Sequence, residues 1–130
     1  HDDLVIIHNM GASCRYCTLW ADGFSGYLRH IEERTSFVVV SPDSPEAQAK
    51  LAQARGWSFR MVQDAEQRFS QELGMLVEGG WWPGASGYHR EADGQITLTG
   101  LRTFGPGDQF CLVWPLFELL DGGPKGWEPH

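Results

Sequence analysis

The chain has 130 residues, of which 42% are hydrophobic and 21% charged, values typical of one globular domain with a substantial core. We therefore expect a single domain over residues 1–130, with 121–130 as a tail. The formal net charge is −7 and the ten basic residues are scattered, which argues against nucleic acid as a partner. No apolar run approaches the roughly 18 residues of a membrane span, and no secretory signal is visible, so we expect no membrane contact and a cytoplasmic location.

The first part of the chain predicts strands that alternate with helices. Apolar runs rich in β-branched residues predict strands at Leu4–Asn9 and Ser36–Asp43, and alternation of apolar and polar residues predicts a third at Phe59–Asp64. Ser13 is expected to cap a helix that runs from Cys14 to about Arg34. Glycines at positions 23 and 26 should kink or break this helix, because glycine weakens a helix interior.

The second helix carries start and stop signals at its ends. Ser44 is its expected cap, Pro45 its first residue and Gly56 its end. Residues 65–75 predict a short helix and "GGWWPG" (79–84) a loop. Residues 85–91 and 95–104 predict a hairpin turned at Asp93-Gly94. A last helix, capped by Asp108, should carry an apolar face made of Phe110, Val113, Trp114, Phe117 and Leu120.

This order of elements predicts an α/β domain. Two strand–helix units that feed a hairpin favour a central mixed sheet with helices on both faces. The segment "CRYC", from Cys14 to Cys17, then lies where the first strand passes into the first helix. The spacing alone fits a metal ligand pair, a structural disulfide or a redox pair.

The position of the two cysteines favours redox chemistry. A helix N-terminus carries about half a positive charge and has free N–H groups, so it stabilises a thiolate. Cys14 is nearer the helix start and is the expected nucleophile, and Cys17 is expected to resolve the mixed disulfide. Arg15 adds a cation beside Cys14. A three-residue separation at a helix start also brings the two sulfurs within disulfide reach.

The segments "CRYCTLWADGF", "PGASGYHREADGQI" and "LLDGGPKG" carry a resemblance to a known family. A strand, a C-x-x-C at the head of the first helix and a later loop proline resemble the thioredoxin fold. More narrowly, the chain from Leu4 to about Gly126 resembles an uncharacterised bacterial thioredoxin-like family of the DUF899 type, described as predicted dithiol-disulfide oxidoreductases near the peroxiredoxin branch. The resemblance implies exchange with a protein or small-molecule disulfide, a thiol pool or reductase as electron source, and no metal or organic cofactor.

The resemblance also assigns roles to individual residues. Cys14 and Cys17 match the redox pair, and Pro83 matches the loop proline that thioredoxins hold in cis, which would turn the Trp82 backbone toward a substrate. His8 stands where thioredoxins keep a buried carboxylate. It is either the proton acceptor for Cys17 or a core histidine with satisfied hydrogen bonds. The Arg-Tyr dipeptide between the cysteines departs from thioredoxins, so the redox potential does not carry over.

Several other interpretations stay open. A structural zinc needs four ligands, and only one C-x-x-C, a distant Cys111 and five scattered histidines are present, so a metal site is disfavoured. Cys111 is expected to be a buried small hydrophobe. A thiol peroxidase of the peroxiredoxin type is a further alternative, although Ser13 precedes Cys14 where that class would place a P-x-x-x-T-x-x-C motif.

A non-catalytic binding module is the alternative from a different class. In that case the Pro83 loop and the adjacent tryptophans would bind a partner. The pair Trp81-Trp82 forms either a substrate-contacting rim or a cover for the sheet edge. Tyr16 is expected to lie exposed over the site and to tune access to it.

Overall fold

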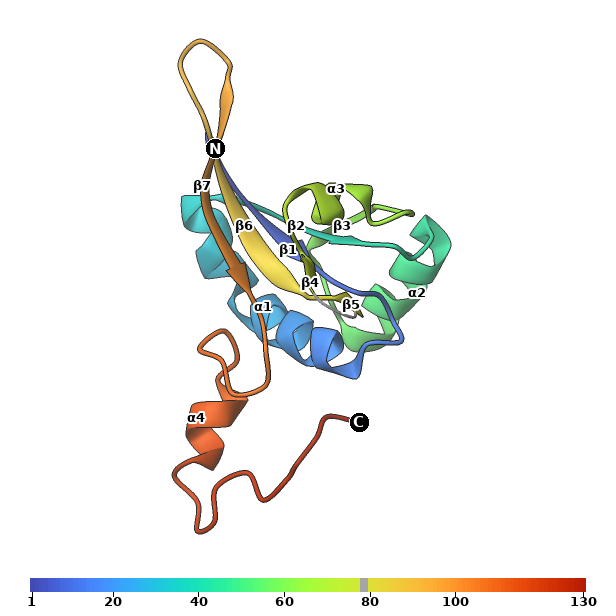
Figure 1. Ribbon diagram of the computed structural model, residues 1–130, viewed down its shortest axis with the longest axis vertical. Helices are drawn as coiled ribbons and strands as arrows, with labels where there is room; N and C mark the ends of the chain where they lie inside the picture. The colour runs from blue at the N-terminus through green and yellow to red at the C-terminus, as the bar shows by residue number, and fades with distance from the viewer. Residues whose placement is uncertain (78–79) are drawn as a thin grey trace.

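The computed structural model, which describes residues 1–77 and 80–130, contains a five-stranded mixed sheet (Figure 1). The strands lie in the order β3-β2-β1-β6-β7. Their bounds are β1 Asp3–His8, β2 Ser36–Ser41, β3 Arg60–Gln63, β6 Gly84–Arg90 and β7 Ile96–Thr103. The first three strands are parallel, and β6 and β7 are antiparallel to their neighbours. The strands predicted from apolar runs are therefore present, with ends shifted by one or two residues.

Helices cover both faces of this sheet, as predicted. The helices are α1 (Arg15–Arg34), α2 (Pro45–Arg55), α3 (Arg68–Glu72) and α4 (Val113–Phe117). Helices α1 and α2 pack against the face that bears Ile7 and Val39, and α3 contacts the opposite face at His8. None of these described helices is long and apolar enough to cross a membrane.

The core between α1 and the sheet is rich in aromatic rings. Phe104, at the end of β7, lies 4.8 to 5.8 Å from the ring centroids of Trp20, Phe24 and Phe110. Strand alternation explains this core, because Val5 and Ile7 point toward α1 while their neighbours point to the other face. The long apolar face of α1 is thereby fixed against the sheet.

Helix α1 differs from its prediction at its start and in its middle. Cys14, not Ser13, is the N-cap, and its sulfur accepts a hydrogen bond from the Cys17 N–H. The helix is continuous through Gly23 and Gly26, so a break at these glycines is absent. Packing of a 20-residue helix outweighs the cost of about 1 kcal/mol per glycine.

The second helix and the hairpin follow their sequence signals. Ser44 caps α2 through the Ala47 N–H, and Gly56 ends it with a φ of 72°. The hairpin turn is held by Asp93, whose side chain accepts from the Gln95 N–H, and by Gly94 at a φ of 87°.

The C-terminal helix is shorter than predicted. Asp108 does not cap it, because its carboxylate accepts hydrogen bonds from the N–H groups of Gly105 and Phe110 and from the Trp20 indole. The loop predicted for residues 79–84 is also partly wrong, since β4 (Leu76–Val77) pairs with β5 (Gly80–Trp81). Position 79 and the side chain of Trp81 lie outside what the structure describes.

Candidate functional site

A disulfide joins Cys14 and Cys17 at the point where the chain leaves β1 and enters α1. The two Cα atoms are 5.2 Å apart, a normal separation for a disulfide. Cys14 is half-buried, whereas Cys17 lies in the core with 2% of its surface exposed. Cys14 is therefore the more accessible of the two cysteines, as the sequence predicts.

Both sulfur atoms receive hydrogen bonds from backbone N–H groups. The Cys17 N–H donates to the Cys14 sulfur at 3.2 Å, and the Met10 N–H donates to the Cys17 sulfur at 3.4 Å. A donor directed at sulfur favours the thiolate over the thiol, as does the positive end of the helix dipole. Either cysteine would thus have its thiolate supported after reduction.

Two side chains that the sequence analysis missed hold the loop before Cys14. The Asn9 Oδ1 accepts from the Gly11 N–H at 2.8 Å, and the Asp43 carboxylate accepts from the Ala12 N–H at 2.8 Å. Gly11 has a φ of 98°, and a Cβ there would lie 2.8 Å from an Asp43 oxygen. This loop conformation therefore requires glycine.

The predicted supporting residues around the cysteines lie differently from expectation. Ser13 is exposed in the loop and does not cap the helix. Arg15 forms an ion pair with Glu128 at 3.0 Å, so its charge is shared with the C-terminal segment. Tyr16 does not stand exposed over the site, because it is half-buried with its ring centroid 6.2 Å from Trp20 and 6.3 Å from Trp114. The core draws this ring in, and Tyr16 is a packing residue.

His8 is a buried histidine with both ring nitrogens engaged. Its Nδ1 lies 2.9 Å from the Ser70 hydroxyl and its Nε2 lies 2.7 Å from the Ser86 hydroxyl. Burial lowers the pKa of His8 to about 4, although the Asp64 carboxylate acts in the opposite direction. His8 is therefore neutral near pH 7, and its ring atoms are occupied. The geometry supports a satisfied core histidine and not a proton acceptor for Cys17.

The Trp82-Pro83 segment is tied to the rest of the protein. Its peptide bond is trans, which differs from the cis bond of the loop proline in thioredoxins. The Trp82 N–H donates to the Met75 carbonyl and the Pro83 carbonyl accepts from the Phe104 N–H, both at 2.8 Å. The Trp82 N–H is therefore already paired and is not free to pair with a bound peptide. The Trp82 side chain is 41% exposed and remains available for contact.

Cys111 and the metal-site alternative complete the candidates from the sequence. Cys111 is free and buried, and burial raises the pKa of its thiol, which matches the expected small hydrophobe. Within residues 1–77 and 80–130, no three His, Cys, Asp or Glu side chains gather into a group that could hold a metal ion.

Several solved structures with a similar fold are peroxiredoxins. A cysteine-to-serine mutant of peroxiredoxin Q from Xanthomonas campestris has a TM-score of 0.68 and 16% identity, covering 78% of this chain and 68% of that chain. A peroxidoxin from Mycobacterium tuberculosis has a TM-score of 0.59 and 21% identity, covering 78% and 67%. A reduced peroxiredoxin from Vibrio vulnificus, in complex with hydrogen peroxide, has a TM-score of 0.63 and 16% identity, covering 81% and 68%. At these identities the likeness shows the thioredoxin-like fold alone.

The family comparison agrees with the resemblance in the sequence. No curated protein matches the chain. The family described as bacterial proteins of unknown function (DUF899) matches residues 2–130, nearly the whole length. The chain belongs to this family, and its fold is thioredoxin-like.

Proposed function

We propose that the protein is a thiol-disulfide oxidoreductase whose redox pair is Cys14 and Cys17. The observation that carries the proposal is the disulfide at the start of α1, which joins a half-buried and a buried cysteine and has a backbone N–H donor on each sulfur. This arrangement suits exchange chemistry, in which one sulfur is attacked from outside while the other leaves as a stabilised thiolate.

The reaction transfers two electrons between the pair and a substrate. In the reduced protein, the Cys14 thiolate attacks a substrate disulfide, forms a mixed disulfide and releases one substrate thiolate. Cys17 then loses its proton to water and attacks the Cys14 sulfur, which releases the second substrate thiolate and leaves the Cys14–Cys17 disulfide. A thiol pool or a reductase returns two electrons, and the reversed steps oxidise a substrate dithiol.

The local charges act mainly through the backbone. The Cys17 N–H supports the Cys14 thiolate, and the Met10 N–H supports the Cys17 sulfur when it is the leaving group. Arg15 adds less than the sequence suggests, because Glu128 neutralises it in an exposed pair. We place this chemistry in a reducing compartment such as the cytoplasm, where a C-x-x-C pair is more often catalytic than structural.

Peroxide reduction is the second candidate, and the fold likeness to peroxiredoxins favours it. In that reaction the Cys14 thiolate attacks the peroxide, forms a sulfenic acid and releases an alcohol or water. Cys17 then displaces water from the sulfenic acid and forms the same disulfide. The two activities share their product, so they differ only in the oxidant that generates it.

The test is a redox titration with thiols counted by intact mass after alkylation. A reversible two-thiol transition is expected in the full chain and in a Cys111→Ser variant, and it should be absent in Cys14→Ser and Cys17→Ser. A midpoint near about −270 mV indicates a reductant and one near about −120 mV an oxidant. Thiols that never oxidise in these buffers, with Cys14→Ser still binding a partner, would leave the non-catalytic binding module as the function.

A second measurement separates the two redox activities. The reduced protein is mixed with hydrogen peroxide or with oxidised glutathione, and disulfide formation is followed by tryptophan fluorescence. A rate constant with the disulfide well above that with peroxide supports disulfide exchange. Rapid peroxide consumption, with a sulfenic acid trapped on Cys14 in Cys17→Ser, would instead assign a thiol peroxidase.

A further inference from the structure

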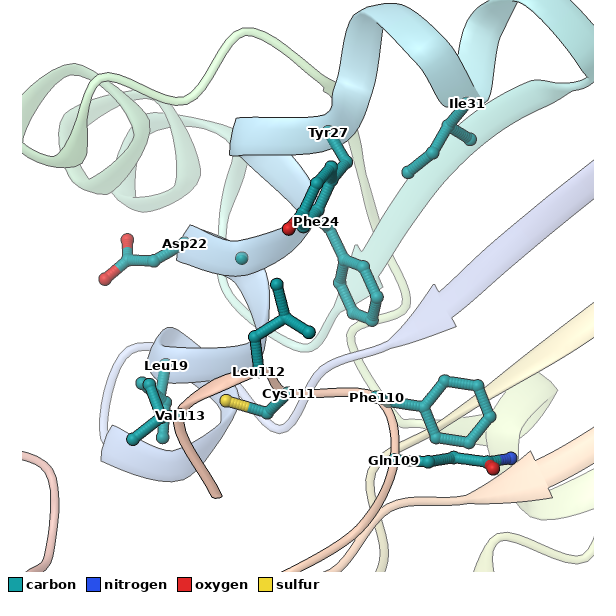
Figure 2. Close-up of a pocket in the computed structure, with 11 residues that line it drawn as sticks. Leu19, Asp22, Phe24, Tyr27, Ile31, Gln109, Phe110, Cys111, Leu112 and Val113 are labelled. Carbon is teal, nitrogen blue, oxygen red and sulfur yellow. The ribbon is translucent and has the colours of Figure 1, made fainter. Parts of the chain in front are cut away.

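An apolar cavity of about 560 Å³ lies between α1 and residues 109–113 (Figure 2). Its walls are mainly the side chains of Leu19, Phe24, Ile31, Phe110, Leu112 and Val113. The carboxylate of Asp22 points away from the ring of Phe24, because Arg55 and the Trp57 indole hold it. Among the described residues, the cavity is therefore lined by no charged group that lacks a hydrogen-bond partner.

A stripe of exposed leucines adjoins this cavity. Its members are 53 to 80% exposed and lie at helical spacing: Leu112, Leu116, Leu119 and Leu120. Backbone hydrogen bonds from Leu116 to Leu112 and from Leu119 to Leu116 continue the α4 turns through the stripe. The other side of α4 is also apolar, because Trp114 is buried in the core. A helical segment that is apolar on both sides is normally covered on both sides.

We propose that the leucine stripe and the cavity form a self-association surface that a second copy of this chain covers. Leu112 lines the cavity and also belongs to the stripe, so the projecting part and the hollow lie next to each other. A two-fold axis beside Leu112 places the stripe of each copy against the cavity of the other. This is the reciprocal contact that a symmetric dimer requires.

The exposed area of the stripe suits the centre of a dimer interface. The exposed fractions of the four leucines add up to the surface of about two and a half fully exposed leucines. At roughly 30 Å² of surface per methylene, this is on the order of 300 Å² of apolar surface per copy. A patch of this size lies at the lower end of the roughly 300–600 Å² that the largest, often functional, apolar patch of a monomer reaches. The cavity walls and a polar rim therefore have to supply the rest of the ~800 Å² per partner that a stable dimer buries.

The charge of the chain sets the salt dependence of this association. Each copy has a formal net charge of −7, and the acidic residues Glu118 and Asp121 lie beside the stripe. Two copies therefore repel one another at low ionic strength, while the apolar contact itself does not depend on charge. Added salt should strengthen the dimer, the opposite of what an interface of ion pairs would show.

The first test is sedimentation of the full chain over a concentration series at 0.05 and 0.5 M NaCl, with a thiol reductant present. A dimer is expected, with a dissociation constant several-fold lower at high salt. Leu116→Asp combined with Leu119→Asp should weaken it at least 100-fold, since both side chains are exposed in the monomer. Ile96→Asp is the matched control: Ile96 is 71% exposed on β7, in the hairpin that Figure 1 shows projecting away from α4, and its loss should leave the dimer intact.

A second variant approaches the surface from the cavity. Gly23 lines the cavity, and a Cβ built there meets no atom within 4 Å, so Gly23→Leu can fill the hollow. It should weaken the dimer at least tenfold without lowering the melting temperature, because leucine favours a helix interior more than glycine does. A chain that stays monomeric at high concentration and high salt would overturn the proposal. So would a dimer that Leu116→Asp/Leu119→Asp and Gly23→Leu leave unchanged.

Discussion

The buried imidazole of His8 should make the stability of the protein fall as the pH drops below about 6.5. The hydrogen bonds to Ser70 and Ser86 hold a neutral ring in the native state, and burial lowers the pKa of His8 to about 4. In the unfolded chain the ring has its ordinary pKa of about 6.5. Between these values the unfolded state binds a proton that the native state does not bind, so acid favours unfolding.

The size of this effect follows from the separation of the two pKa values. One pKa unit corresponds to about 1.4 kcal/mol, so the full loss is ~3 kcal/mol by pH 4 and ~2 kcal/mol by pH 5. This is a large part of the 5–15 kcal/mol that stabilises a typical domain. The contribution of the neutral His8 ring to the free energy of unfolding is complete above pH 6.5 and is lost as the pH falls through the native pKa.

Urea unfolding followed by tryptophan fluorescence at pH 7.5, 6.5, 5.5 and 5.0 measures this loss. His8→Gln is the reference, because glutamine can bond to the two serines and does not titrate. Hydrogen bonding to Asp3 raises the pKa of His89, which makes that group more favourable in acid, but it is present in both proteins and cancels in the difference. The wild type should lose ~2 kcal/mol more than His8→Gln between pH 7.5 and 5.0. Parallel curves for the two proteins would refute the reasoning.

Three further predictions concern packing and are read by urea unfolding at pH 7.5. Gly84→Ala places a Cβ on the Arg102 carbonyl oxygen of the neighbouring strand, so a loss of at least ~1–3 kcal/mol is expected. Gly26→Ala adds a Cβ that meets no atom within 4 Å inside α1, so a gain of ~0.5–1 kcal/mol is expected, and a loss would contradict the unstrained helix. Phe104→Ala removes a buried ring 5.3 Å from Trp20 and should cost ~3–5 kcal/mol, whereas a cost below ~1 kcal/mol would contradict the assigned core.

The fold was predictable because its signals are local. The caps of α2 at Ser44 and Gly56 and the turn at Asp93-Gly94 need only the residues around them. The errors arose where distant contacts decide. Asp108 looked like a helix cap, but the Trp20 indole and two loop N–H groups use its carboxylate. An aspartate that caps a helix and one that accepts hydrogen bonds from loop N–H groups have the same sequence pattern. Only the position of Trp20 distinguishes the two here.

The position of the two cysteines at the start of the first helix was also predictable, but most of their surroundings were not. The groups that donate hydrogen bonds to the two sulfurs are the backbone N–H groups of Met10 and Cys17, which any residue except proline supplies. No residue type marks such a donor in a sequence. Conversely, the residues with an obvious chemical identity, His8 and Arg15, bond to Ser70, Ser86 and Glu128 and away from the disulfide.

Asp43 is the part of the site that topology could have supplied. Strands β1 and β2 are parallel, with His8 opposite Val40, so the segments that follow the two strands leave the sheet at the same edge, where both strands end. The loop after β1 carries Cys14, and a carboxylate three residues beyond Val40 must emerge beside that loop. Gly11 has a positive φ and admits the approach, and the Asp43 carboxylate then bonds to the Ala12 N–H. The disulfide loop is thus held by a pairing of strand ends, which explains how a site with few side-chain contacts keeps a defined geometry.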